Sequence, residues 1–157
     1  MSEFNLKNFL RYAKELILVF SQFFIIALHF FQWEIIPNKK IFEVNTLSYS
    51  LGILIIIFAL IVMFIAIKDL GSNLSPFPRP ITNGKLVTKG IYGFTRHPMY
   101  YSLIFISFGV FIIRLSIYYL FLTLSLASII KFKIILEEKY LNNKFKNYVL
   151  YKNDVKY

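Results

Sequence analysis

The chain alternates between long apolar stretches and short charged segments, and four of the apolar stretches have the length of candidate membrane helices. Residues 16–31 and 47–67 contain no acidic or basic residue, and residues 98–113 and 115–130 are separated only by Arg114. A helix needs about 20 apolar residues to span the hydrocarbon layer, and about 17 can suffice. Because backbone groups in lipid must be hydrogen-bonded internally, these stretches predict helices. We therefore expect an all-α integral membrane protein with about four transmembrane helices.

The third and fourth stretches predict a tight helical hairpin with its turn near Leu115. Arg96 lies 19 residues before this turn, and Glu137 and Glu138 lie 22 and 23 residues after it. At about 1.5 Å per residue the two arms of the hairpin are nearly equal in length. We therefore expect Arg96 and His97 to meet the two glutamates at one face of the membrane.

Residues 69–97 differ in composition from the apolar stretches around them. Together with Pro98 they contain four of the five prolines, and they contain four of the six glycines, which predicts turns and extended pieces. A loop of this length in a small protein is usually functional or disordered. Because several of its residues are apolar enough to pack, we expect an ordered loop that forms a site.

The end of the chain continues the helical pattern. Glu138, Leu141, Phe145 and Tyr148 recur at helical spacing, which predicts that the fourth helix continues beyond the two glutamates and covers the loop. A basic amphipathic tail that lies on lipid fits the same residues equally well. We divide the single membrane domain into two N-terminal spans (1–68), a cytoplasmic loop (69–97), the helical hairpin (98–136) and a C-terminal cytoplasmic helix or tail (137–157).

Composition supports a membrane protein of one domain. Of the 157 residues, 57% are hydrophobic and 17% are charged, whereas soluble domains contain about half apolar and about a quarter charged residues. This excludes a soluble enzyme and a disordered chain. With no cysteine, the chain has no disulfide, thiolate metal site or cysteine nucleophile.

The net charge of +10 follows the predicted topology. If the N-terminus is cytoplasmic, 15 of the 18 Lys and Arg residues lie on the cytoplasmic side, and Lys39, Lys40 and Arg114 lie on the other. This distribution obeys the positive-inside rule and predicts a multi-pass protein with both termini in the cytoplasm. The basic excess then indicates a lipid bilayer as the partner, and we expect no nucleic-acid binding.

The start of the predicted hairpin favours anions. Pro98 suits the first turn of a helix, where free N–H groups and the positive end of the helix dipole lie beside Arg96 and His97. Contact of these side chains with lipid phosphate is the simpler interpretation. The only other histidine, His29, lies within the first span, where it is either functional or a neutral group hydrogen-bonded between helices. With two histidines and no cysteine, we expect no metal site.

Two segments and a C-terminal motif carry a family resemblance. LGSNLSPFPRP (70–80), LVTKGIYGFTRHPMY (86–100) and Glu137-Glu138-x-x-Leu141-x-x-x-Phe145-x-x-Tyr148 resemble the isoprenylcysteine carboxyl methyltransferase family. These are integral membrane enzymes that use S-adenosylmethionine. The resemblance implies a cofactor site between the loop, the start of the hairpin and the C-terminal helix.

The resemblance also implies roles for individual residues. The cofactor site would contain Lys85, Leu86, Val87, Tyr92, His97, Pro98, Met99, Tyr100 and Glu137. We predict catalytic roles for Arg96 and Glu138. Lys133, at a position where the family tends to have arginine, would face the substrate.

The resemblance favours methylation of a lipid-like or prenylated acceptor, with a carboxylate as the first candidate. A carboxylate is already ionised at neutral pH and needs no general base to attack a sulfonium methyl group. A phospholipid or amine N-methyltransferase is the alternative, because it shares the cofactor. An NADPH-dependent sterol-type reductase, which usually has Asn where Met99 stands, and a non-enzymatic membrane protein are further alternatives.

Overall fold

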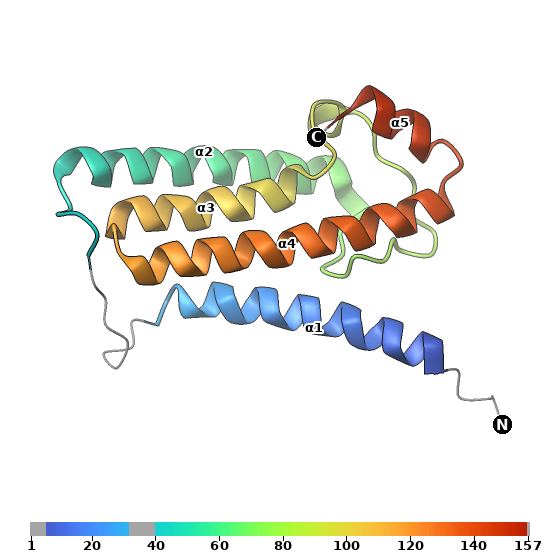
Figure 1. Cartoon of the computed structure of the whole chain (residues 1–157). Coiled ribbons are helices and arrows are strands. Elements are labelled where there is room, and N and C mark those ends of the chain that lie inside the picture. Colours follow the sequence, from blue (N-terminus) through green and yellow to red (C-terminus); the bar gives the residue numbers. More distant parts are fainter. Residues whose placement is uncertain (1–5, 32–39, 157) are drawn as a thin grey trace.

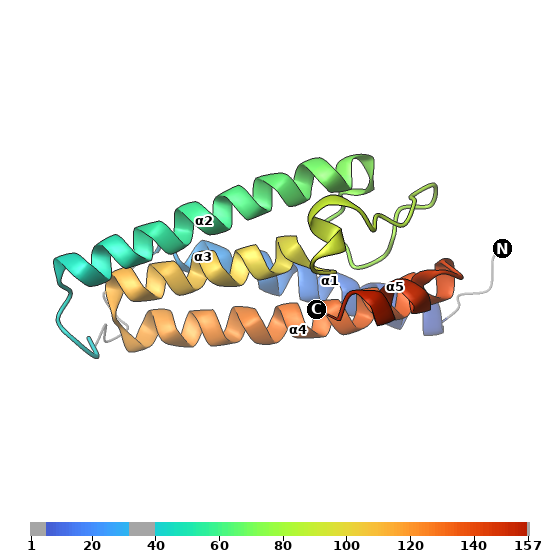
Figure 2. The same cartoon turned by 90° about the horizontal axis from the view of Figure 1, so that it is seen from above.

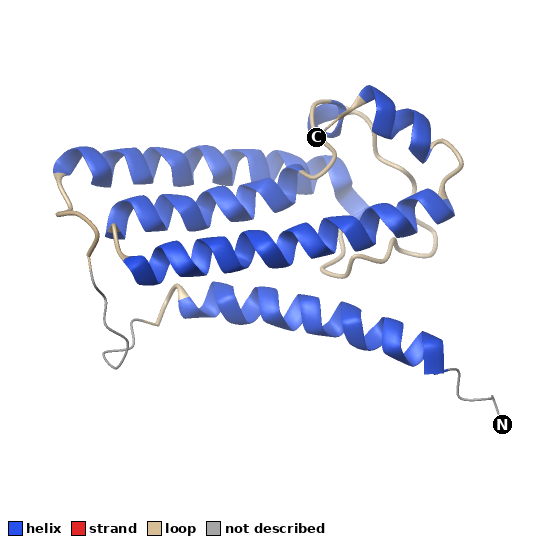
Figure 3. Cartoon of the chain, in the orientation of Figure 1, coloured by secondary structure: helices blue, strands red, loops and turns tan. Residues whose placement is uncertain are grey.

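The structure, a computed structural model, describes residues 6–31 and 40–156, with side chains described from residue 9 onward. The five α-helices are α1 (Leu6–Leu28), α2 (Thr46–Leu70), α3 (Pro98–Arg114), α4 (Ile117–Lys144) and α5 (Tyr148–Asp154). Two short 3₁₀ helices, η1 (Gly71–Asn73) and η2 (Gly90–Gly93), belong to the connection between α2 and α3. No strand occurs in the described residues (Figure 3), so the predicted all-α fold is confirmed.

The four long helices form an antiparallel bundle in the order α2, α3, α4, α1 (Figure 1), with contacts between each successive pair. The start of α1, the end of α2, the start of α3 and the end of α4 all lie at one end of the bundle. We call this the loop end, because the connection 71–97 and α5 also lie there (Figure 2). Segments far apart in sequence therefore meet at a single place.

Within the part of the chain that the structure describes, two helical segments are long and apolar enough to cross a membrane, Thr46–Asn73 and Ile117–Lys144, and Pro98–Arg114 is a shorter apolar helix. Helix α1 begins at Leu6, well before the apolar stretch that predicted it. The number of spans and the cytoplasmic location of the termini stay predictions. Lys39, one of the three cations expected on the opposite side, lies outside the described residues.

Helices α2 and α3 approach closely through two glycines. A Cβ atom added to Gly52 would lie 2.5 Å from Ile113 Cγ1 and 2.7 Å from the carbonyl oxygen of Gly109. Small residues allow helices to pack at short range where lipid provides no hydrophobic driving force. This contact holds α3 along α2, so that the start of α3 lies beside the end of α2.

The predicted hairpin turn is confirmed. Leu115 has a left-handed conformation with φ of 46° and ends α3, its N–H donating to the carbonyl of Phe111. Ser116 then caps α4 by accepting from the backbone N–H of Tyr118 at 3.2 Å. The turn returns α4 to the loop end.

The C-terminal region agrees with one prediction and differs from another. Helix α4 continues beyond the two glutamates, as predicted, since it passes through residues 136 and 137 without a break. The prediction of one continuous helix through Tyr148 was wrong, because α4 ends at Lys144 and α5 begins at Tyr148. The break lets α5 turn back, where Tyr148, Tyr151 and Val155 form a buried cluster against the loop.

Candidate functional site

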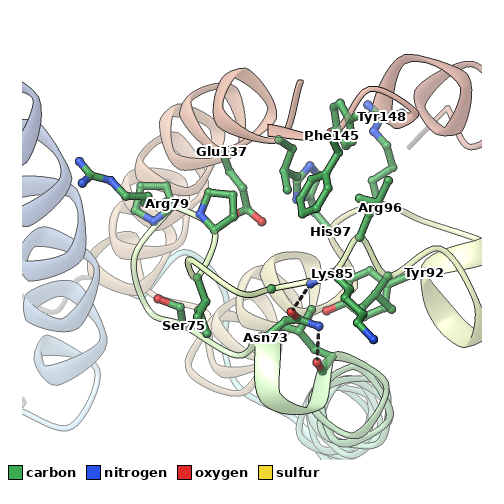
Figure 4. A pocket seen from close by; sticks show the side chains of 18 of the residues that line it. Asn73, Ser75, Arg79, Lys85, Tyr92, Arg96, His97, Glu137, Phe145 and Tyr148 are labelled. Carbon is green, nitrogen blue, oxygen red and sulfur yellow. Dashed lines mark hydrogen bonds between the residues drawn. The ribbon is translucent and has the colours of Figure 1, made fainter. Parts of the chain in front are cut away.

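A cleft opens at the loop end between the connection 71–97, the start of α3, the end of α4 and α5 (Figure 4). It has a volume of about 790 Å³, including the part open to solvent. The lining combines apolar and ionisable side chains that come from segments far apart in the sequence.

Nine predicted site residues line the cleft: Lys85, Leu86, Val87, Tyr92, Arg96, His97, Met99, Tyr100 and Glu137. Three others, Pro98, Lys133 and Glu138, lie beside it but do not line it. Pro98 is buried in the first turn of α3, where it sets the start of the helix.

Glu137 provides the carboxylate of the cleft. Its Oε2 accepts a hydrogen bond of 2.7 Å from the hydroxyl of Tyr100, and the side chain points into the cleft (Figure 4). The ring of Tyr100 is stacked on His97, with centroids 5.8 Å apart and an angle of 19° between the planes. The start of α3 therefore orients the acid of α4.

Glu138 faces another way and is held by the cationic side chains of Arg96 and Lys152, with His97 beside it. Its Oε1 accepts from Arg96 Nη2 at 2.7 Å and lies 3.4 Å from His97 Nε2, while its Oε2 accepts from Lys152 Nζ at 2.6 Å. Arg96 also donates to the backbone carbonyl of Val155, beyond the end of α5. This cluster, which we call the Glu138 clamp, joins the loop, the hairpin and α5.

Lys133 does not line the cleft; it is buried between α4, α1 and the loop. It is 1% exposed, its Nζ donates to Gln22 Oε1 of α1 and to the carbonyl of Pro76 at 3.0 Å, and it lies 5.1 Å from the centre of the Tyr100 ring. A contact between Lys133 and a substrate, as predicted from the sequence, is a matter for experiment.

Sequence reasoning assigned no role to two side chains that shape the loop. Asn73 Oδ1 accepts from the Lys85 N–H at 2.9 Å, and Asp69 Oδ2 accepts from the Ile91 N–H at 2.8 Å. Gly90 allows the second contact, since its φ is +63° and a Cβ there would lie 2.0 Å from Asp69 Oδ2. The sequence contained a sign of these roles, because Asn73 and Gly90 belong to segments 70–80 and 86–100, which carry the family resemblance.

Aromatic residues of α5 and of the turn before it cover one side of the cleft. Leu86, Leu141 and Phe145 pack against the buried cluster of Tyr148, Tyr151 and Val155. The Tyr151 hydroxyl donates to the carbonyl of Tyr92 at 2.6 Å, which fastens α5 to η2. These contacts close the cleft on the side of α5.

The tyrosine hydroxyls of this region are neutral. Burial raises the pKa of Tyr92 and of Tyr148 well above the usual value, and it raises the pKa of Tyr151 to about 12. The Tyr148 hydroxyl is buried and has no hydrogen-bond partner among the described residues. Tyr148 is also one of the residues that line the cleft, so an unpaired buried donor belongs to its wall.

A comparison with protein-family models matched residues 47–148 to the phospholipid methyltransferase family. A search of the curated proteins and a search of the solved structures each found no match. The matched region covers more than half of the chain and contains every residue that we predicted for the site. The specific resemblance to isoprenylcysteine carboxyl methyltransferases is not confirmed, although both families belong to one superfamily of membrane methyltransferases. The chain therefore belongs to the phospholipid methyltransferase family and is a membrane methyltransferase.

Proposed function

We propose that the protein binds S-adenosylmethionine in the cleft and transfers its methyl group to an acceptor carried by a lipid. The observation that carries this proposal is the Glu137 carboxylate, which lines the cleft with one oxygen held by Tyr100. Methyltransferases of this family typically use the same cofactor. The match to the phospholipid methyltransferase family supports methyl transfer to an acceptor carried by a lipid.

The residues of the cleft fit the chemical groups of this cofactor. Glu137 would hold the ammonium of the methionyl part, since its Oε1 has no hydrogen-bond donor among the described residues. Leu86, Val87 and Phe145 provide an apolar wall against which a nucleobase can pack. The unpartnered Tyr148 hydroxyl offers a hydrogen bond to a polar atom of the cofactor.

When bound, the cofactor supplies an electrophilic methyl group on a sulfonium. The protein then needs to align the acceptor with that group and to exclude water. Alignment falls to Glu137 and Tyr100, and exclusion of water falls to the cover formed by Phe145 and Tyr148. No general base is required unless the acceptor is a protonated amine.

Two classes of acceptor have support. The match to phospholipid methyltransferases supports an amine headgroup, and we take this as the first candidate. A carboxylate is the second candidate, because Lys133 is a buried basic residue that, among the described residues, donates hydrogen bonds to the neutral oxygens of Gln22 and Pro76. Such a charge attracts an anionic acceptor and repels a cationic one.

Binding in lipid nanodiscs tests the cofactor. S-adenosylmethionine should bind the wild-type protein, and Glu137→Gln should weaken binding at least tenfold, because a buried hydrogen-bonded charge contributes about 1.5–3 kcal/mol. Glu43→Gln is the matched control, since Glu43 is exposed and distant from the loop end. Equal affinities of the wild type and Glu137→Gln would remove the proposed site.

Labelled cofactor then identifies the acceptor in lipid extracts. Label that alkali releases indicates a methyl ester, and label stable to alkali indicates a methylated amine. Lys133→Met, which removes the charge and keeps the length, should raise KM for a carboxylate acceptor and should not raise KM for an amine acceptor. An unchanged KM in this variant would exclude a role of Lys133 in binding the acceptor.

A further inference from the structure

Polar side chains recur on α1 and on the turn that ends it, at a spacing of seven residues. Glu15, Gln22 and His29 follow this spacing, and Glu15 and Gln22 are only 3% and 6% exposed. Seven residues are about two helical turns, so the three side chains lie along one face. Buried polar groups on an apolar helix require partners. This stripe lies outside the region matched to the family.

Each member of the stripe binds a different part of the bundle. His29 Nε2 lies 2.7 Å from Ser107 Oγ of α3, which agrees with the interpretation of His29 as a group hydrogen-bonded between helices. Gln22 accepts from Lys133 of α4. Glu15 Oε1 accepts from Arg79 Nη2 at 2.9 Å and from the hydroxyl of Tyr140. Only Glu15 bonds directly to the loop that lines the cleft.

Arg79 belongs to residues 76–82, which we call the proline wall because they contain Pro76, Pro78 and Pro80. Five of the seven residues of this wall line the cleft. The three prolines have no N–H, so backbone hydrogen bonds can hold this segment only weakly. The wall therefore depends on contacts made from outside the cleft.

Those contacts come from α1 and α4. The Arg79 side chain points away from the cleft towards α1 (Figure 4), and its guanidinium lies 4.2 Å from the centre of the Tyr12 ring. Lys133 donates to the carbonyl of Pro76, and Lys144 donates to those of Ile81 and Thr82. The bond from Arg79 to the Glu15 carboxylate joins opposite charges and ties this wall to α1.

We propose that Glu15 and Arg79 form a latch through which α1 holds the proline wall in its place against the cofactor. Helix α1 is then a part of the cofactor site, and both residues are positioning residues. The part of this inference that concerns the cofactor rests on the function proposed above. The part that concerns the wall rests only on the contacts.

Hydrogen exchange of residues 76–87 tests the latch without any ligand. Glu15→Gln and Arg79→Gln should each raise exchange in this segment about tenfold, because each removes one charge of the pair. The increase in the double variant should be smaller than the two single increases combined, since both substitutions break the same ion pair. Unchanged exchange in both single variants would overturn the proposal.

His29→Leu is the matched control. It breaks a polar contact of the same stripe, two heptads along and away from the cleft. We expect exchange of residues 76–87 to stay at the wild-type level in this variant. A rise as large as that in Glu15→Gln would show that general loosening of α1, and not the latch, controls the wall, and would refute the proposal.

Cofactor binding separates the two proposals. If the latch positions the wall for S-adenosylmethionine, Glu15→Gln and Arg79→Gln should raise its Kd several-fold, and Arg79→Lys, which keeps the charge, should recover part of the loss. If the wild type binds no S-adenosylmethionine while exchange responds as expected, the latch stands and the proposed function fails. If exchange responds and the Kd is unchanged, α1 does not contribute to the cofactor site.

Discussion

Replacing Glu138 with glutamine should release α5 from the hairpin while Glu137 stays in the cleft. Glu138 accepts two hydrogen bonds from Arg96, from Nη2 at 2.7 Å and from Nε at 3.0 Å, and one from Lys152 at 2.6 Å. Arg96 in turn donates to the carbonyl of Val155. The charge of Glu138 is therefore the centre of the contacts that dock α5.

The free energy that Glu138→Gln removes from the docking of α5 depends on how exposed Glu138, Arg96 and Lys152 are. The side chains of Arg96 and Glu138 are 11% and 14% exposed, so their pair is largely shielded from water, whereas Lys152 is 50% exposed. A hydrogen bond to a charged group contributes about 1.5–3 kcal/mol, and an exposed ion pair contributes about 1 kcal/mol or less. We expect a total of about 2 kcal/mol in the docking of α5. This corresponds to a roughly 30-fold increase in the detached population.

Hydrogen exchange over residues 148–155 measures that population directly, and binding of S-adenosylmethionine measures its effect on the cleft. Glu138→Gln should raise exchange of α5 and weaken binding, because Tyr148 covers the cleft. Glu137→Gln should weaken binding and leave α5 protected. If Glu138→Gln leaves α5 protected but abolishes methyl transfer, the clamp is not structural and the catalytic role predicted from the sequence is correct.

Three further substitutions test single contacts. Tyr100→Phe removes the donor to Glu137 and should weaken cofactor binding several-fold in a titration, as expected for a bond of about 1 kcal/mol; an unchanged affinity would show that the phenol does not orient the acid. Gly90→Ala should lower thermal stability in detergent more than Gly71→Ala, because both have positive φ but only Gly90 has a carboxylate where the new Cβ would lie; equal effects would refute the clash. Gly52→Val should lower the melting temperature by separating α2 from α3, at a cost of about 2 kcal/mol or more, and an unchanged melting temperature would contradict the close approach.

Most of the fold could be predicted because its causes are local or general. Lipid requires internally bonded helices, and the constant rise of a helix placed the turn near Leu115 and brought Arg96 to Glu138. The break after Lys144 could not be predicted from spacing, because Phe145 and Tyr148 continue the helical period across it. The burial of the α5 aromatic residues against the loop, which involves partners about sixty residues away, outweighed that local pattern.

The candidate site, like the fold, has features that could be predicted from the sequence and features that could not. By itself the sequence determined that a carboxylate pair, an Arg-His-Pro turn and a proline-rich loop meet at one end of an apolar hairpin. The resemblance assigned Glu137 to the cofactor site, but only the tertiary structure decided that Glu138 binds Lys152 of α5, because adjacent residues on a helix point about 100° apart and the packing of α4 sets the rotation. It also decided that Glu15 of α1 meets Arg79, since no periodicity relates a helix to a loop 64 positions away. Such pairings depend on which helices pack together, and helix packing is a property of the whole bundle.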